Sequence, residues 1–429
     1  MSGKNTLLQD RRGFLASTLA LLAGSSLSKS LGVVQSLAAP NREEMPLPRW
    51  EPGVLEIHHI ATGRGNSTLV IGPDGTTLLI DAGEAHSAEN LMSPARPGTS
   101  LRAGQWIARY VERQIDRIDQ SGLDMMLLTH LHGDHVGEVA ATSPQSARGS
   151  YKLTGAADVV EALQVREIVD RGWPDYRYPS PPRDATSLNY IAMAKAQAAL
   201  GTRVQQARAG SLSQLALRRN PALYPLFSAR ILAVNGNVWT GEGETSKSLF
   251  PSLEGLAGEA LPNENMCCVA LRIGYGKFSY YTGGDLTCDT VYGQYPWHDI
   301  ETPVAELAGA VSVAQADHHG YFDACGPAAV RALHPRVWII PTWHASHPAL
   351  GVLANLFSRD LYAGDRSVFA LDMAPAALLT TERFSSGLAC SDGHVVIRVP
   401  PGGSTFSVFA VNSSDESGTV VASFVPYTT

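Results

Sequence analysis

The pattern HxHxDH, formed by His130, His132, Asp134 and His135, constrains this chain more than any other feature. Three imidazoles and one carboxylate fall within six residues, directly after an apolar run at residues 125–128. In an extended chain, alternation places His130 and His132 on one side, and the turn that follows can bring Asp134 and His135 toward a second centre. Imidazole and carboxylate are ligands of borderline metals such as zinc, with manganese or iron as alternatives. The pattern therefore predicts a metal site on a loop at the end of a strand.

Two later segments have the form expected of loops that complete such a site. One strand-like run ends in Gly-Gly and Asp285, and another ends in His318 and His319. Together with HxHxDH, these segments resemble the metallo-β-lactamase superfamily. The narrower pattern, which adds a later His347 followed by proline, is similar to the hydrolase domain of ComEC-type DNA-uptake proteins, related phosphodiesterases and phosphorylcholine esterases. The resemblance covers roughly residues 54–400.

The resemblance implies two metal centres with ligands taken from His130, His132, Asp134, His135, Asp285, His318 and His319. His130 and His132 would bind the first metal, the other two residues of the motif would bind the second, and Asp285 would bridge the two. One histidine of the adjacent pair would complete the second centre. His318 is preferred because it ends the strand, although His319 precedes a glycine as the final ligand does in lactamases.

The first centre lacks one ligand of the usual pattern. Lactamases and glyoxalase-type members have a further histidine between the motif and the bridging aspartate, but this chain has none between His135 and His298. Water, Glu264, Asn265 or a substrate oxygen could complete the first centre, or that centre could be weak or empty. ComEC-like members and phosphorylcholine esterases depart in the same way, so the gap favours that branch.

The implied chemistry is attack by a water that two neighbouring metals activate as hydroxide. Asp134 could orient the attacking group, and His347, with His344 in reserve, could protonate the leaving group. Asp81, at the Asp-x-Gly position of the family, could orient a ligand histidine, and Asn265 could hold substrate or water. Each also has a purely structural interpretation, as a turn or loop residue.

We therefore expect an exported, metal-dependent hydrolase that acts on phosphoesters. Hydrolysis of an amide, lactone or thioester, including a β-lactam, is the alternative, and a non-catalytic scaffold of the same fold is a third. Di-iron redox chemistry is less favoured because it usually involves the missing histidine. The chain has neither a G-x-S-x-G nucleophile elbow nor a GxxxxGK[ST] phosphate loop, which argues against a serine hydrolase and against nucleotide-driven chemistry.

The first 38 residues read as a twin-arginine export signal. Arg11 and Arg12 precede an apolar stretch at residues 14–22, which is too short to span a bilayer, and residues 36–38 form a plausible cleavage site. This predicts recognition by the twin-arginine translocase, a periplasmic or secreted location, and no membrane association after cleavage.

Charge argues against nucleic acid as a general partner. The chain has 33 basic and 40 acidic residues, and removal of residues 1–38 leaves 29 and 39, a net charge of −10. An acidic surface lacks the electrostatic footprint of a nucleic-acid binder, so a small-molecule substrate is expected. The five cysteines include the adjacent Cys267 and Cys268, show no zinc-type CxxC spacing, and could form one disulfide whose pairing stays open.

The fold class expected from the resemblance is α/β, with an αββα four-layer sandwich in one domain at residues 39–429. Apolar periodicity predicts a helix over residues 106–118. Alternation and turn residues predict strands at 55–60, 68–71, 77–80, 123–129, 266–273, 277–282, 395–399 and 407–411. The last two strands are expected to complete the second sheet.

Residues 140–262 are expected to be a helical insertion between the first and second metal motifs. A helix is predicted from about residue 188 to 208. The aromatic stretch at residues 173–179 could act as a lid or substrate wall, in which Trp173 or Tyr176 would contact the substrate. Packing is the alternative role for these aromatic rings.

Overall fold

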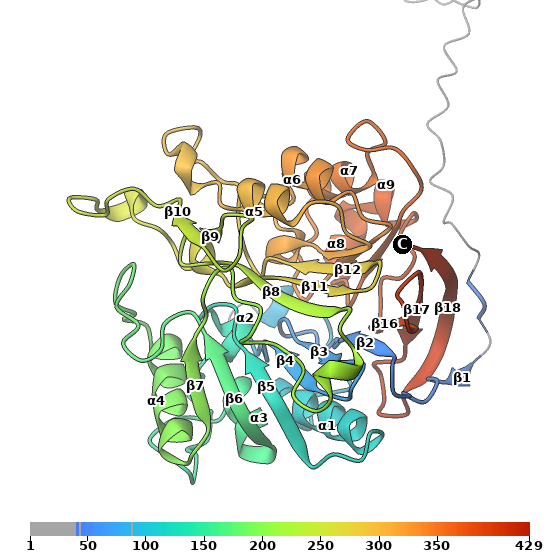
Figure 1. Ribbon diagram of the computed structural model, residues 1–429, viewed down its shortest axis with the longest axis horizontal. Coiled ribbons are helices and arrows are strands. Elements are labelled where there is room, and N and C mark those ends of the chain that lie inside the picture. Colours follow the sequence, from blue (N-terminus) through green and yellow to red (C-terminus); the bar gives the residue numbers. More distant parts are fainter. Residues whose placement is uncertain (1–39, 43, 87–88) are drawn as a thin grey trace, which may run out of the picture. The chain divides into compact units, whose positions relative to one another are not determined.

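Two β-sheets organise the part of the chain that the computed structural model describes, residues 40–42, 44–86 and 89–429 (Figure 1). The first sheet has the strand order β1-β18-β17-β16-β2-β3-β4-β5-β6-β7. Its strands are β1 (Met45–Pro46), β2 (Leu55–His59), β3 (Thr68–Ile71), β4 (Thr77–Ile80), β5 (Gly122–Leu127), β6 (Gln164–Asp170), β7 (Arg203–Gln206), β16 (His394–Val399), β17 (Thr405–Val411) and β18 (Thr419–Thr428).

The second sheet has the strand order β10-β9-β8-β11-β12-β13-β14-β15. Its strands are β8 (Phe227–Val234), β9 (Asn237–Trp239), β10 (Ser246–Ser248), β11 (Ala270–Tyr275), β12 (Phe278–Thr282), β13 (Val313–Gln315), β14 (Val337–Ile340) and β15 (Ser367–Ala370). Each sheet contains a parallel part, β4 to β7 in the first and β12 to β15 in the second. Because parallel strands end at the same edge, the loops that follow β5, β12 and β13 can carry groups to a common site.

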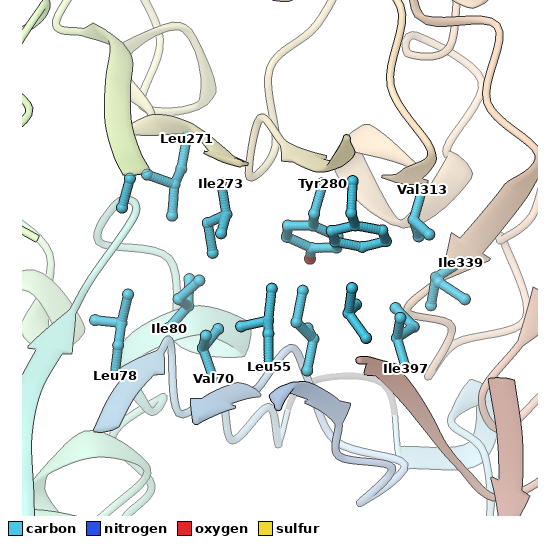
Figure 2. Packing of buried hydrophobic residues seen from close by; sticks show 14 of the residues in the cluster. Leu55, Val70, Leu78, Ile80, Leu271, Ile273, Tyr280, Val313, Ile339 and Ile397 are labelled. Carbon is cyan, nitrogen blue, oxygen red and sulfur yellow. The ribbon is translucent and has the colours of Figure 1, made fainter. Parts of the chain in front are cut away.

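The main hydrophobic core lies between the two sheets. Figure 2 shows side chains of the first sheet, such as Leu55 and Ile397, facing those of the second, such as Leu271 and Tyr280. All four are fully buried. This packing fixes the sheets against each other, and therefore fixes the loops that each sheet carries.

Helices cover the outer faces of the sheets. The helices are α1 (Ala103–Asp116), α2 (Gly133–Val136), α3 (Ala156–Ala162), α4 (Ala185–Ala199), α5 (Glu301–Ala308), α6 (Pro327–Leu333), α7 (Leu350–Phe357), α8 (Pro375–Thr380) and α9 (Glu382–Ser385). The apolar stripe of α1, including Ile107 and Val111, packs on Leu79 and Met126 of the first sheet, together with residues of α3 and α4. Helices α5 to α7 lie beside the second sheet (Figure 1). The protein is thus a mixed α/β structure of two sheets and helices, as expected.

No helix in the described ranges is long and apolar enough to cross a bilayer. The predicted export signal at residues 1–38 lies outside the described residues. All five cysteines are described, and each is a free thiol.

The tail strands were expected in the second sheet, and this is wrong. β16 pairs antiparallel with β2, with Val395 opposite His59, and β17 and β18 extend the same first sheet. Alternation predicts a strand and its buried face, but its pairing partner is decided by tertiary contacts hundreds of residues away in the chain.

The segment at residues 140–262 is not mainly helical. It contains α3 and α4, but it also supplies β6 and β7 to the first sheet and β8 to β10 to the second. The helix expected over residues 188–208 ends at Ala199, because Gly201, at φ 101°, turns the chain into β7. Likewise, the strand expected from residue 266 begins at Ala270, after a 3₁₀ turn at Asn265–Cys267.

The core between the sheets gives a stability prediction. Leu271→Ala should lower the free energy of unfolding by about 2–5 kcal/mol, because it leaves a cavity between two sheets that cannot collapse freely. Leu379→Ala is the matched control, since Leu379 is 78% exposed, and it should change stability little. Urea unfolding followed by tryptophan fluorescence measures both; equal losses would contradict the core assignment.

Candidate metal centre

The HxHxDH loop follows β5 and is held by backbone hydrogen bonds to the loop before β3 and the loop after β4. The Ala82 N–H donates to His135 O at 2.9 Å, and the Asn66 N–H donates to Asp134 O at 2.8 Å. A side chain at Gly83 could not fit, because its Cβ would lie 1.7 Å from Asp134 O. The Asp-x-Gly pattern at residues 81–83 therefore reflects close packing of two loops as well as the carboxylate that it carries.

Four candidate ligands converge in a buried cluster. One donor atom from each of Asp134, His135, Asp285 and His319 lies within 4.8 Å of the others. His135 Nε2 is 3.0 Å from Asp285 Oδ1, and His319 Nε2 is 2.9 Å from Asp134 Oδ2. The two Nε2 atoms are 3.3 Å apart. We call this set the second centre.

Another group of donor atoms shares Asp285 with the second centre. Donor atoms of His130, His132 and Asp285 also lie within 4.8 Å of one another, and we call this set the first centre because its two histidines begin the HxHxDH motif. His130 Nε2 is 3.1 Å from His132 Nδ1 and 3.7 Å from Asp285 Oδ2. Asp285 therefore stands between the two groups, with one oxygen nearest His135 and the other facing His130 and His319. This is the position that a bridging carboxylate would occupy.

The Nδ1 atoms of three histidines are engaged by neighbouring acceptors. His135 Nδ1 donates to Asp81 at 2.8 Å, His319 Nδ1 donates to Pro341 O at 2.9 Å, and His130 Nδ1 lies 3.2 Å from Thr129 Oγ1. A carbonyl oxygen only accepts, so His319 carries its proton on Nδ1. With Nδ1 engaged, Nε2 is the atom of the His135 and His319 rings that faces the cluster and can serve as the metal ligand.

The spacing of these nitrogens fits a metal ion. Ligands bound tetrahedrally to zinc at 2.0–2.1 Å lie about 3.3 Å from each other. The separations of 3.1 Å for His130 and His132, and of 3.3 Å for His135 and His319, are close to this value. The donor set of imidazoles and carboxylates, with no cysteine in either group, suits zinc, manganese or iron.

Asp81 has the contacts expected of a residue that orients a ligand. It is fully buried, and its backbone φ of 59° lies in the left-handed region. Its carboxylate accepts hydrogen bonds from the backbone N–H and the hydroxyl of Thr129, from Asn66 Nδ2 and from His135 Nδ1. Four donors therefore fix the carboxylate, which in turn fixes the ring of His135.

Charge in the cluster favours a cation. Burial opposes ionisation of Asp285, but the neighbouring His135 and His319 hold the pKa of this carboxyl well below its usual value. Burial likewise opposes protonation of His135, but Asp285, Asp81 and Asp134 raise its pKa well above the usual range. The carboxylates therefore attract positive charge to this position, which a divalent ion would supply.

His319, and not the His318 preferred from the sequence, lies in the cluster with Asp134, His135 and Asp285. His318 Nδ1 lies 2.7 Å from Asp323 Oδ1, while its Nε2 lies 3.3 Å from Asn265 Nδ2 and 3.8 Å from Asp285. Both histidines have positive φ, 46° and 55°. This turn, which strand alternation does not predict, directs His319 inward and leaves His318 at the edge.

Glu264, one candidate for the missing ligand of the first centre, pairs with Arg171 and lies outside both groups of donor atoms. Both carboxylate oxygens accept hydrogen bonds from Arg171 at 2.5 Å, and one of them also accepts from the Leu131 N–H at 2.9 Å. Asn265 reaches His318 instead of the first centre. Arg171 and Asp323 have no signal in the sequence, since no pattern shows that an arginine after an apolar strand is buried or which carboxylate a histidine contacts.

His347 packs against the cluster. Its ring stacks on His319, with centroids 5.1 Å apart at 27°, and meets Trp343 edge-on. Burial and the neighbouring His319 lower the pKa of His347 well below its usual value. His344 is half-buried and bonds to Ser346 Oγ.

A pocket of about 260 Å³ opens onto the cluster. His132 and Asp134 line it from the site, and Glu138, Asp184 and Trp343 form further parts of its wall. The aromatic stretch at residues 173–179 is not among the lining residues. Tyr176 is buried and bonds to Asp170 Oδ2, so it anchors the loop.

Comparison with known families agrees with the motif. Residues 61–142 match the model of the metallo-beta-lactamase superfamily. The matched segment includes Asp81 and the four residues of HxHxDH, whereas Asp285 and His319 lie beyond it. No curated protein matches the chain. Members of this superfamily are mostly metal-dependent hydrolases, and the His/Asp cluster is a potential metal site of the kind they use.

The different positions of His318 and His319 predict different metal contents for their alanine variants. His319→Ala should remove one equivalent of bound metal, because its Nε2 is part of the second centre. His318→Ala is the matched control in the next residue, and it should retain the metal content of the parent protein. Metal analysis by plasma mass spectrometry after gel filtration checks both, and the reverse result would restore His318 as the ligand.

Proposed function

We propose that this protein is a metal-dependent hydrolase of phosphoesters with two zinc ions bound by the first and second centres. The observation that carries the proposal is the convergence of two histidine groups on the two oxygens of Asp285. The first centre has three protein donors and so leaves a position for water or substrate, which is a property of catalytic rather than structural zinc sites. The αββα four-layer arrangement and the likeness to ComEC-type hydrolases belong to the same proposal.

The proposal includes export. The twin-arginine segment at residues 11–12 would direct the folded, metal-loaded protein to the periplasm or beyond, with cleavage after Ala38. The net charge of −10 calculated for the remaining chain supports a small-molecule substrate rather than nucleic acid.

In the proposed reaction, each residue of the cluster has a different role. Bound zinc ions would supply a water of lowered pKa and stabilise charge that develops on the substrate oxygens. Asp134, part of whose carboxylate faces the pocket, would accept a hydrogen bond from the attacking water and orient it. Asp81 keeps His135 in the tautomer that leaves Nε2 free. His347 supports the ring of His319, and we do not assign it proton transfer.

The pocket favours diesters over monoesters. Its wall carries Asp134, Glu138 and Asp184, and it has no lysine or arginine among its lining residues. A phosphomonoester carries close to two negative charges at neutral pH, whereas a diester carries one. Repulsion from the acidic wall should therefore discriminate against the more highly charged substrate.

The test combines metal content with turnover on one sample. The parent protein should hold two equivalents and hydrolyse bis(p-nitrophenyl) phosphate faster than the monoester, in a reaction that chelator abolishes. Asp285→Asn should lose metal and at least about 100-fold in kcat/KM, since even partners behind the ligands contribute 10–100-fold. Asp289→Asn is the control, because Asp289 is an exposed carboxylate on the same loop.

Other outcomes would redirect the proposal. Two equivalents of metal with turnover of nitrocefin alone would assign the site to amide or lactam hydrolysis. Less than one equivalent and no turnover of any of these substrates would make the chain a non-catalytic member of the fold.

A further inference from the structure

An ion pair between a buried arginine and a partly exposed glutamate bonds to the backbone between two candidate ligands. Arg171 and Glu264 form two hydrogen bonds of 2.5 Å, and their side chains are 1% and 21% exposed. The oxygen of Glu264 that accepts from Arg171 Nε also accepts from the N–H of Leu131 at 2.9 Å. Leu131 stands between His130 and His132, so the pair contacts the chain at the middle of the first centre.

The position of Arg171 is itself fixed from the first sheet. The preceding Asp170 is fully buried, and its carboxylate accepts from the hydroxyls of Tyr176 and Tyr190, at 2.5 and 2.8 Å. The carbonyl of Arg171 accepts from Asn235 Nδ2 at 2.6 Å. The backbone of Arg171 is therefore fixed at the end of β6, and its guanidinium can hold the Glu264 carboxylate in one place.

The segment that carries Glu264 touches the other site loops as well. The N–H of Asp285 donates to Cys268 Sγ at 3.2 Å, and the N–H of Val269 donates to Thr129 O at 2.9 Å. Residues 264–269 thus join the HxHxDH loop of the first sheet to the Asp285 loop of the second. The hydrogen bond that Glu264 accepts from the Leu131 N–H connects this segment to the peptide between the two histidines of the first centre.

An ion pair with one buried partner is poor evidence of a stabilising role. Desolvation of the Arg171 guanidinium offsets its attraction to Glu264, and well-packed apolar residues often stabilise a protein as much. The pair does have a geometric consequence, because a bidentate arginine fork fixes the orientation of a carboxylate. Here that orientation sets the position of the peptide between two ligands of a centre that has no third histidine.

We propose that Arg171 and Glu264 are positioning residues of the first centre, and that they hold His130 and His132 in metal-binding geometry where related proteins have a further ligand. The inference rests on the proposed function. It predicts that the affinity of the first centre depends on this pair, while the second centre, built from Asp134, His135 and His319, does not.

The test is titration of the full chain, stripped with chelator, with Co²⁺ alone. Calorimetry resolves the binding events, and the d–d absorption of Co²⁺ reports ligand geometry. His132→Ala removes a ligand of the first centre only, so the event that it abolishes is assigned to that centre. Thermal unfolding of each metal-free variant shows whether the fold is retained.

Glu264→Gln should weaken binding at the first centre about 10–100-fold and change its d–d spectrum, because the amide keeps an acceptor for the Leu131 N–H but loses the charge that Arg171 holds. Arg171→Met should do the same, and Arg171→Lys should restore part of the affinity. Glu167→Gln is the matched control on β6, where the carboxylate bonds to Arg218 and lies outside both metal groups. The second centre should keep its affinity in every variant.

Three results would overturn the inference. Parent affinity at both centres in Glu264→Gln and Arg171→Met would show that the pair does not position the histidines. Equal weakening of both centres, with a lower melting temperature, would show a general structural role. If the parent protein binds less than one equivalent, the proposed function fails first and the inference fails with it.

Discussion

The candidate site depends on the hydrogen bonds that occupy the Nδ1 atoms of His135 and His319. Asp81 and the carbonyl of Pro341 accept from His135 and His319, and both acceptors are fixed before any ion binds. With one nitrogen of each ring engaged, the other has a free lone pair and a defined direction. The ligand cluster is therefore preorganised by the acceptors that surround it. The same hydrogen bonds offset the free energy that is lost when polar side chains are buried.

The sheets contribute different parts of that cluster, so packing and chemistry are linked. His130, His132, Asp134 and His135 follow β5 of the first sheet, whereas Asp285 and His319 follow β12 and β13 of the second. The apolar core between the sheets brings Asp285 Oδ1 to 3.0 Å from His135 Nε2. The segment at residues 264–269 adds a polar connection at the same place, and Arg171 determines where it lies.

Much of this arrangement can be predicted from the sequence, for reasons that differ by element. HxHxDH is local, and β3 and β4 are short apolar runs with β-branched residues and a Pro-Asp-Gly turn between them, so their bounds match the structure. The sheet to which β16 belongs and the choice of His319 over His318 depend on distant pairing and on two positive φ angles. The burial of Arg171 opposite Glu264 and the stacking of His347 are likewise tertiary facts without a local signal.

The central claim is that two metal ions share Asp285. Anomalous diffraction from crystals of the zinc-loaded protein, recorded on both sides of the zinc absorption edge, would locate the ions without assumption about activity. The account predicts two peaks about 3.5–4 Å apart, one beside His130 and His132 and one beside His135 and His319, with the carboxylate of Asp285 between them. A single peak away from Asp285, or no peak in this cluster, would contradict it.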